Sequence, residues 1–190
     1  MADSTQVENY SIGDKKEDKI EDVLRITKQL TDSQILFLIQ KAKTDRKVKR
    51  FTHDPTRFTT IEEFRSWEKN KELYGMADSK GGLYGIIWFE KMKLPDNKTF
   101  SAPINPTDYG ITFAIRLYDK ARGQGLTRKF MGAAFSDLLR QPFYVDEEHK
   151  GIWLSTSHDN TPAVTGYQHF GFKQVTNKNS EGKISMIYKT

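Results

Sequence analysis

The chain has 190 residues, of which 36% are hydrophobic and 29% charged, a composition typical of a globular protein with an ordinary core. It contains no cysteine, which excludes disulfides, thiolate metal sites and a cysteine nucleophile. No apolar run reaches the roughly 18 residues that a membrane helix needs, and the polar N-terminus lacks the apolar segment of a secretory signal. We therefore expect a cytoplasmic protein that binds no membrane. The formal net charge of +5 permits an anionic partner but identifies none.

The chain begins with polar residues and interspersed charges, which predict a flexible tail over residues 1–20. Residues 21–190 are then expected to form one domain. Its first element is a predicted strand, Val23–Leu30. Thr31 follows as a capping residue for a helix over residues 33–43.

A capping-box pattern, Thr-Thr-Ile-Glu-Glu at residues 59–63, predicts a second helix over residues 61–72. Two apolar and aromatic runs on either side of residues 78–82 predict a β-hairpin. The densest basic run, Lys41–Arg50, is interpreted as the solvated end of a helix, with an anionic partner as the alternative.

The second half alternates strands and helices. Strands are predicted at Tyr109–Asp119 and Gly151–Ser157, and apolar residues at helical spacing predict a helix over residues 126–139 between them. Asn160 is a candidate cap for a short helix that ends at Gly171, before a last hairpin. This order predicts an α/β (α+β) protein with one mixed sheet.

A glycine-rich junction joins the strand that ends at Asp119 to the following helix. Backbone N–H groups at a helix start lack intrahelical partners, and glycines let a phosphate approach them closely. The junction is therefore either a phosphate cradle, with Arg122 and Arg128 adding charge, or a tight turn without a ligand. The candidate cradle residues are Arg122, Gly123, Gln124, Gly125, Leu126 and Thr127.

Two nucleotide-binding motifs do not fit this junction. A Walker loop needs Gly-Lys before Ser or Thr, but Gly182 and Lys183 precede Ile184. A dinucleotide fingerprint needs a third glycine at position 128, which is arginine. A different phosphate-bearing ligand is therefore expected.

The junction resembles the Gln/Arg-x-x-Gly-x-Gly/Ala loop of the GCN5-related N-acetyltransferases (GNAT), through Arg122, Gly125 and Thr127. Thr127 departs from the usual small residue but keeps its backbone N–H. A second motif of the family is similar to residues 159–172, where Asn160, Ala163, Tyr167 and Phe170-Gly171-Phe172 fall in register. The resemblance covers roughly residues 20–190 and includes the order of the elements.

The resemblance implies a mostly antiparallel mixed sheet of about seven strands, with two splayed central parallel strands and about four helices. It implies an enzyme that moves an acetyl group from acetyl-CoA to a primary amine by direct attack. The pyrophosphate of CoA would meet Arg122–Thr127, and its pantetheine arm the backbone near Ile115 and Leu117. Asn160 is read as a helix cap and as a contact to that arm.

The implied reaction needs a proton donor for the departing thiolate and an acceptor for the proton of the amine. Tyr167 matches the tyrosine that serves as general acid in the family; the alternative is a ring that packs in the core beside Phe170. Some relatives carry a glutamate base at the position of Ser155, so that mechanism is not transferred. The candidate bases are Glu90, Asp108, His158 or a water molecule.

Other readings stay open. One is a degenerate module of the same fold that binds acyl-CoA without transfer. Another is a basic interaction protein, although Trp67, Trp88 and Trp153 are not paired with a basic stripe, so we expect no nucleic-acid partner. His53, His149, His158 and His169 lack metal-ligand spacing, so we expect no metal. The acceptor is a small amine or a peptide or protein N-terminus, and the protein a monomer or homodimer.

Overall fold

A mixed seven-stranded sheet forms the centre of the computed structural model, in which residues 24–96, 99–145 and 150–190 are described. The strands are β1 (Arg25–Thr27), β2 (Lys71–Ala77), β3 (Leu83–Lys91), β4 (Ile111–Leu117), β5 (Gly151–Ser157), β6 (Lys173–Gln174) and β7 (Lys183–Lys189). Their order is β1-β2-β3-β4-β5-β7-β6, and every neighbouring pair is antiparallel except β4 and β5. The predicted mixed sheet is therefore confirmed.

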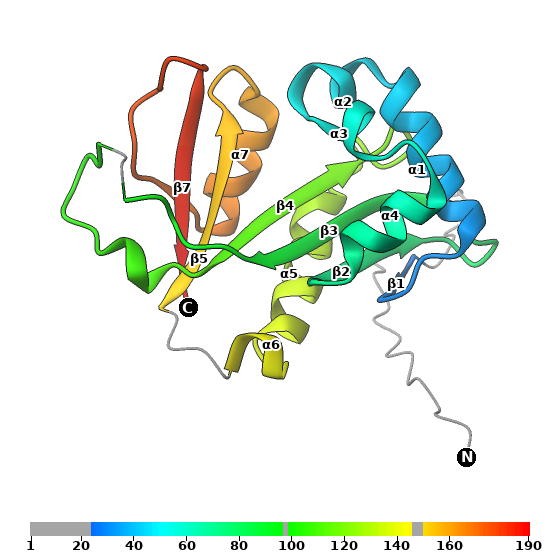
Figure 1. The fold of residues 1–190 in the computed structure, drawn as a ribbon, viewed down its shortest axis with the longest axis horizontal. Coiled ribbons are helices and arrows are strands. Elements are labelled where there is room, and N and C mark those ends of the chain that lie inside the picture. The colour runs from blue at the N-terminus through cyan, green and yellow to red at the C-terminus, as the bar shows by residue number, and fades with distance from the viewer. Residues whose placement is uncertain (1–23, 97–98, 146–149) are drawn as a thin grey trace.

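Helices cover both faces of the sheet (Figure 1). The helices of the described residues are α1 (Asp32–Thr44), α2 (Arg46–Phe51), α3 (Asp54–Arg57), α4 (Ile61–Glu68), α5 (Leu126–Leu138), α6 (Pro142–Val145) and α7 (Thr161–Phe170), with a 3₁₀ turn, η1 (Pro106–Asp108). The expected four correspond to the longer helices α1, α4, α5 and α7.

Each face of the sheet has its own apolar core, because side chains alternate along a strand. On the face of α5 and α7, Phe113 of β4 packs with Phe135 of α5 and Tyr167 of α7. On the opposite face, under α1 to α4, Trp88 of β3 packs with Trp67 of α4 at a ring-centroid distance of 5.1 Å. Strand β4 thus lies between the two cores, and its last residues pack against both of them.

The predicted helix starts in the first half are confirmed. Thr31 caps α1 in a complete capping box, in which its hydroxyl accepts from the N–H of Gln34 and the Gln34 amide oxygen accepts from the N–H of Thr31. Thr60 caps α4 by accepting from the N–H of Glu63. Both caps satisfy N–H groups that would otherwise lack partners.

Three local predictions were wrong in extent. The first strand covers only Arg25–Thr27, since Thr27 turns the chain by donating to the carbonyl of Gln29. The second helix ends at Glu68, because β2 begins at Lys71. The basic run is not one helix end: Asp45 divides it into the end of α1 and all but the last residue of α2.

Asn160 occupies the N-cap position of α7, but its side chain makes no capping bond. Its backbone carbonyl accepts from the N–H groups of Ala163 and Val164, both at 3.0 Å. The predicted capping side chain is therefore wrong, whereas the predicted end of α7 at Gly171, with φ of 118°, is confirmed.

Candidate functional site

A wedge opens between β4 and β5, the only parallel neighbours among the described strands. They pair at Ile111 with Ile152 and at Thr112 with Trp153, and at no further described position. Figure 1 shows the two strands diverging from that end. Beyond Thr112, the edge of β4 that faces β5 has no strand partner.

The backbone of β4 presents alternate residues to this wedge. The N–H of Tyr118 donates to the carbonyl of Tyr84, beyond the end of β4, at 2.9 Å, so residues of even number direct their backbone groups toward β3. Residues of odd number therefore face β5: the N–H of Phe113 serves the pair of Thr112 with Trp153, and the N–H and C=O groups of Ile115 and Leu117 are directed into the wedge. Ile115 and Leu117 are half-buried. The family resemblance implied these two residues as backbone contacts for the pantetheine arm, and the strand register explains why their backbone groups are open.

The glycine junction lies at the open end of the wedge, between β4 and α5. Gly123 and Gly125 have φ of 75° and 69°, the left-handed region that favours glycine. A Cβ at either position would meet no atom within 4 Å, so conformation and not crowding requires glycine here. The two glycines and Gln124 are exposed.

Free backbone donors gather at this junction. The first N–H groups of α5 have no intrahelical acceptor, and the N-cap residue Gly125 supplies no side chain. No described residue outside the helix accepts from the N–H of Gly123, Gly125, Leu126 or Thr127. Together with the positive end of the helix dipole, these groups suit a phosphate.

Arg122 is placed differently from the prediction. Its guanidinium pairs with Asp45, at 2.8 Å between Nη2 and Oδ2, and with Asp119, at 3.0 Å between Nη1 and Oδ1. Its backbone N–H donates to the carbonyl of Tyr118 at 3.3 Å. Arg122 is thus held by carboxylates, while Arg128 is exposed.

The other predicted cofactor residues lie around the same junction. Leu126 packs against the core of α5 and α7. Thr127 lies beside α7, since a Cβ on Gly166 would be 3.7 Å from its Cγ2. Asn160, at the start of α7, has no side-chain partner among the described residues. Its amide is therefore available to a ligand.

Tyr167 lies on the inner side of α7, next to the point where the wedge begins. Its side chain is buried, and its ring centroid is 6.1 Å from that of Phe113. Burial raises the pKa of the Tyr167 phenol, and the charge of Arg116 opposes that rise only in part. The phenol therefore stays protonated at neutral pH, and no described residue shares a hydrogen bond with its hydroxyl.

The three candidate bases lie in different places. Glu90 of β3 is paired in register with Thr112, where β4 and β5 separate, and its carboxylate is 3.3 Å from the ammonium of Lys71. Asp108 is at the closed end, 3.1 Å from Lys150 Nζ. His158 follows β5 and is exposed. Glu90 is the one next to the start of the wedge.

Sequence reasoning missed the partner of Arg122. Asp45 was assigned to a basic helix end, whereas it is a buried carboxylate that caps α2. The available signal was an N-cap residue type directly before a new helical segment. Its pairing with Arg122, far along the chain, produces no local sequence pattern.

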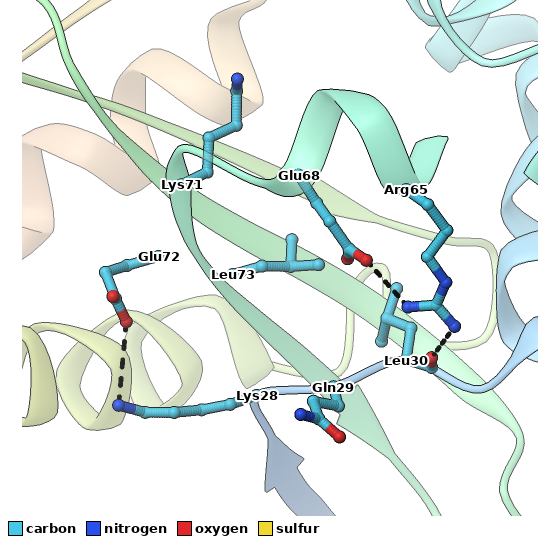
Figure 2. Close-up of a pocket in the computed structure, with 8 residues that line it drawn as sticks. All are labelled: Lys28, Gln29, Leu30, Arg65, Glu68, Lys71, Glu72 and Leu73. Atoms are coloured by element: carbon cyan, nitrogen blue, oxygen red, sulfur yellow. Dashed lines mark hydrogen bonds and ion pairs between the residues drawn. The ribbon is translucent and has the colours of Figure 1, made fainter. Parts of the chain in front are cut away.

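A cavity of about 550 Å³ lies away from the wedge, beside the outer edge of β2 (Figure 2). It exists because β1 pairs only with Gly75–Ala77, which leaves the first part of β2 without a neighbouring strand. Its charged side chains pair with each other, as Arg65 does with Glu68 at 2.8 Å and Lys28 with Glu72 at 3.8 Å. These pairs indicate no class of ligand.

Over the described ranges, no group of three or more His, Asp or Glu side chains is placed to hold a metal ion. His149 lies outside those ranges, as does the predicted tail over residues 1–20. Within the same ranges, no helix combines the length and apolar character needed to cross a membrane.

No sequence model of a protein family matches the chain, and neither does any curated protein. Solved structures do match. A Vibrio cholerae spermidine N-acetyltransferase in complex with CoA and spermine superposes with a TM-score of 0.59 at 15% identity, over 86% of this chain and 92% of that one. A domain from Methanocaldococcus jannaschii superposes with a TM-score of 0.60 at 15% identity, over 88% and 98%. The chain has the fold of the GCN5-related N-acetyltransferases.

Proposed function

We propose that the protein transfers an acetyl group from acetyl-CoA to an amine. The observation that carries the proposal is the presence of two sets of free backbone groups, one on the β4 edge in the wedge and one at the N–H cluster where α5 begins. A thioester with an amide-containing arm and a pyrophosphate has matching groups in the same order. The resemblance of the sequence and the likeness to N-acetyltransferases support this reading.

The pyrophosphate is assigned to the N–H groups of Gly123, Gly125, Leu126 and Thr127, with Gln124 exposed beside them. The pantetheine arm is assigned to the backbone of Ile115 and Leu117, where it would take the place of the missing strand neighbour. The Asn160 amide is also assigned to the arm, because Asn160 begins α7 shortly after β5, which forms one side of the wedge. These contacts would bring the thioester to the level of Phe113.

The attacking amine is expected on the side of α1 to α4. A carbonyl under attack gains negative charge on its oxygen, and a fixed N–H donor stabilises that charge. The pair of Thr112 with Trp153 uses the N–H of Phe113, so the N–H of Ile115 is the first free donor of β4 beyond β5. We assign this role to the N–H of Ile115, which leaves its C=O and the backbone of Leu117 for the arm.

Proton transfer is assigned to two side chains on opposite faces of β4. Tyr167 donates to the departing thiolate, and Glu90, on the face of α1 to α4, accepts the proton of the amine through a water molecule or directly. The ammonium of Lys71 lies 3.3 Å from the carboxylate of Glu90. Asp108 is too close to the closed end for this role, and His158 lies beyond β5.

The proposed reaction defines the acceptor only as an amine. The neighbour from Vibrio cholerae is a spermidine N-acetyltransferase bound to spermine, so polyamines belong in the first set of acceptors. Amino acids, amino sugars and peptides with free N-termini complete the set. A panel that includes all four classes tests polyamines without assuming that the acceptor is one of them.

The test has two stages. Thermal unfolding with and without acetyl-CoA measures cofactor binding, and a ligand at about 100 times its Kd should add roughly 2.7 kcal/mol to the free energy of unfolding. Release of free thiol with the acceptor panel then measures transfer. No change in melting temperature at millimolar acetyl-CoA or CoA contradicts the proposal. Binding without thiol release on any acceptor favours the degenerate binding module.

A further inference from the structure

The junction between α1 and α2 contains a buried carboxylate with two tasks. Asp45 is the C-terminal cap position of α1 and the N-cap of α2. Its Oδ1 accepts from the N–H of Lys47 at 2.9 Å and from the N–H of Val48 at 3.2 Å. Capping α2 accounts for one oxygen only, since both N–H groups bond to Oδ1.

The second task of Asp45 is to hold Arg122. Nη1 of Arg122 donates to Oδ1 at 3.1 Å, and Nη2 lies 2.8 Å from Oδ2, in an ion pair that lacks the alignment of a hydrogen bond. The side chain of Asp45 is 2% exposed. Burial by itself would raise its pKa, but the hydrogen bonds from Arg122 and from Val48 outweigh that effect, so the pKa lies below its ordinary value.

The same guanidinium reaches a second carboxylate. Asp119, two residues after the end of β4, accepts from Nη1 of Arg122 at 3.0 Å and from Nζ of Lys41 at 2.7 Å. Lys41 belongs to the last turn of α1. The chain between β4 and α5 is thus fastened at two points to the region where α1 ends and α2 begins.

These fastenings matter because the junction has little packing of its own. Gly123 and Gly125 are exposed and have open space where a Cβ would stand. Ala121 is buried, and the next four residues are not. The free N–H groups that we assign to the pyrophosphate are therefore positioned largely through Arg122.

We propose that Asp45 is a positioning residue for CoA: it holds Arg122 against the α1–α2 junction and so fixes the turn whose N–H groups receive the pyrophosphate. The inference depends on the proposed function. The same contacts couple α1 and α2, on the side of the proposed acceptor, to the turn between β4 and α5. Movement at the α1–α2 junction then alters the affinity for CoA.

The competing role for Arg122 is direct contact with a phosphate of CoA. In that case the guanidinium would leave Asp45, and a buried carboxylate would lose its counter-charge, which is strongly unfavourable. The two roles make opposite predictions for Asp45. As a positioning residue it aids binding, whereas as a competitor for Arg122 it opposes binding.

The experiment measures the Kd of CoA by calorimetry for the parent, Asp45→Asn, Arg122→Gln and the double variant. Asparagine caps helices as well as aspartate does, so Asp45→Asn removes mainly the charge. We expect each single variant to bind CoA about 10-fold more weakly, and the double variant no more weakly than the weaker single, because contacting residues act as a pair. If transfer is found, KM for acetyl-CoA rises by a similar factor while kcat at saturation stays within about 3-fold.

Two further variants separate positioning from general stability. Asp137→Asn removes another ion-paired carboxylate, at the far end of α5, and should lower the melting temperature without changing the Kd of CoA. Arg122→Lys keeps a cation that could meet phosphate but cannot hold both carboxylates. It should bind CoA as weakly as Arg122→Gln, and it serves as the test if Asp45→Asn does not fold.

Unchanged CoA binding by Asp45→Asn overturns the inference, and tighter binding overturns it and also assigns Arg122 to the phosphate. So does near-parental binding by Arg122→Lys. These results leave the proposed function standing, because the parent still binds CoA. Failure of the parent to bind CoA instead removes the proposed function and this inference with it.

Discussion

Tyr167 of α7 lies against Phe113 of β4, with their ring centroids 6.1 Å apart and nearly perpendicular at 83°. Phe113 is the residue directly after the last pair between β4 and β5. The contact therefore places a buried, protonated phenol at the start of the wedge. In the proposed reaction, that is where the sulfur of the thioester arrives.

Removing only the hydroxyl of Tyr167 tests its role as acid. Tyr167→Phe keeps the ring and its contacts with Phe113, so stability should change little. If the hydroxyl protonates the thiolate, kcat and kcat/KM should fall together by about 10²- to 10⁴-fold. The Kd of acetyl-CoA should stay near that of the parent. A turnover within a few-fold of the parent would mean that the ring serves packing alone.

Glu90→Gln tests the proposed proton acceptor. The amide cannot take a proton near neutral pH, so we expect kcat/KM to fall by about 10²-fold or more. The matched control is Glu72→Gln, one strand away and directed to the opposite face with Lys28. Its rate should equal the parental rate. If both variants keep the parental rate, Glu90 is not the base, and the neutral amine arises from its own protonation equilibrium.

Gly125→Val tests the loop at its αL residue. A β-branched residue at φ of 69° is strained, by about 1–3 kcal/mol, so the backbone that positions the free N–H groups should shift. We expect a lower melting temperature and a marked loss of CoA affinity by calorimetry. Gly132→Val is the control, since a Cβ there also meets open space but the residue lies inside α5 with no φ in the left-handed range. A folded Gly125→Val that binds CoA normally would show that the cradle is misplaced.

Asp137 should make stability sensitive to acid. Burial would raise its pKa, but hydrogen bonds from Lys28 and Tyr74 outweigh this and lower it. A carboxyl with a lowered folded pKa contributes stability above its unfolded pKa of about 3.9 and loses it as the pH falls through the folded pKa. Urea unfolding of Asp137→Asn should show a deficit of roughly 1–3 kcal/mol at pH 7 that shrinks as the pH falls below the unfolded pKa of about 3.9.

The control for that series is Asp32→Asn, whose carboxylate is exposed and pairs with Arg65 at 2.9 Å. Exposed pairs contribute about 0–1 kcal/mol, so its deficit should be small at every pH. A deficit of Asp137→Asn that persists unchanged at acidic pH would show that the charge of Asp137 is not its source.

Local signals in the sequence predicted most of the fold. The short run Gly151–Ser157, with three consecutive apolar residues, predicted β5 with its observed bounds, and the turn residues between two apolar runs predicted the hairpin of β2 and β3. The caps at Thr31 and Thr60 were equally local. Each of these features is decided within a few residues of the chain, which is the range over which a sequence pattern carries information.

Features that depend on distant pairing were not predictable from local patterns. Asp45 reads as one acid in a basic run, and its role depends on Arg122, which is 77 positions away. The end of pairing between β4 and β5 after Thr112 is likewise a property of two strands. The resemblance to a family supplied the splayed strands, and only the register shows which residues of β4 face the gap.

The register of β4 has a consequence for hydrogen exchange. β4 shares seven residue pairs with β3 and β5 shares seven with β7, whereas two pairs join the halves across the middle. Amide protection should therefore alternate along a single strand: slow at Ala114 and Arg116, whose N–H groups are bonded to β3, and fast at Ile115 and Leu117. A molecule bound in the wedge would slow hydrogen exchange at Ile115 and Leu117 alone. Deuterium uptake at the four consecutive residues would therefore detect its binding.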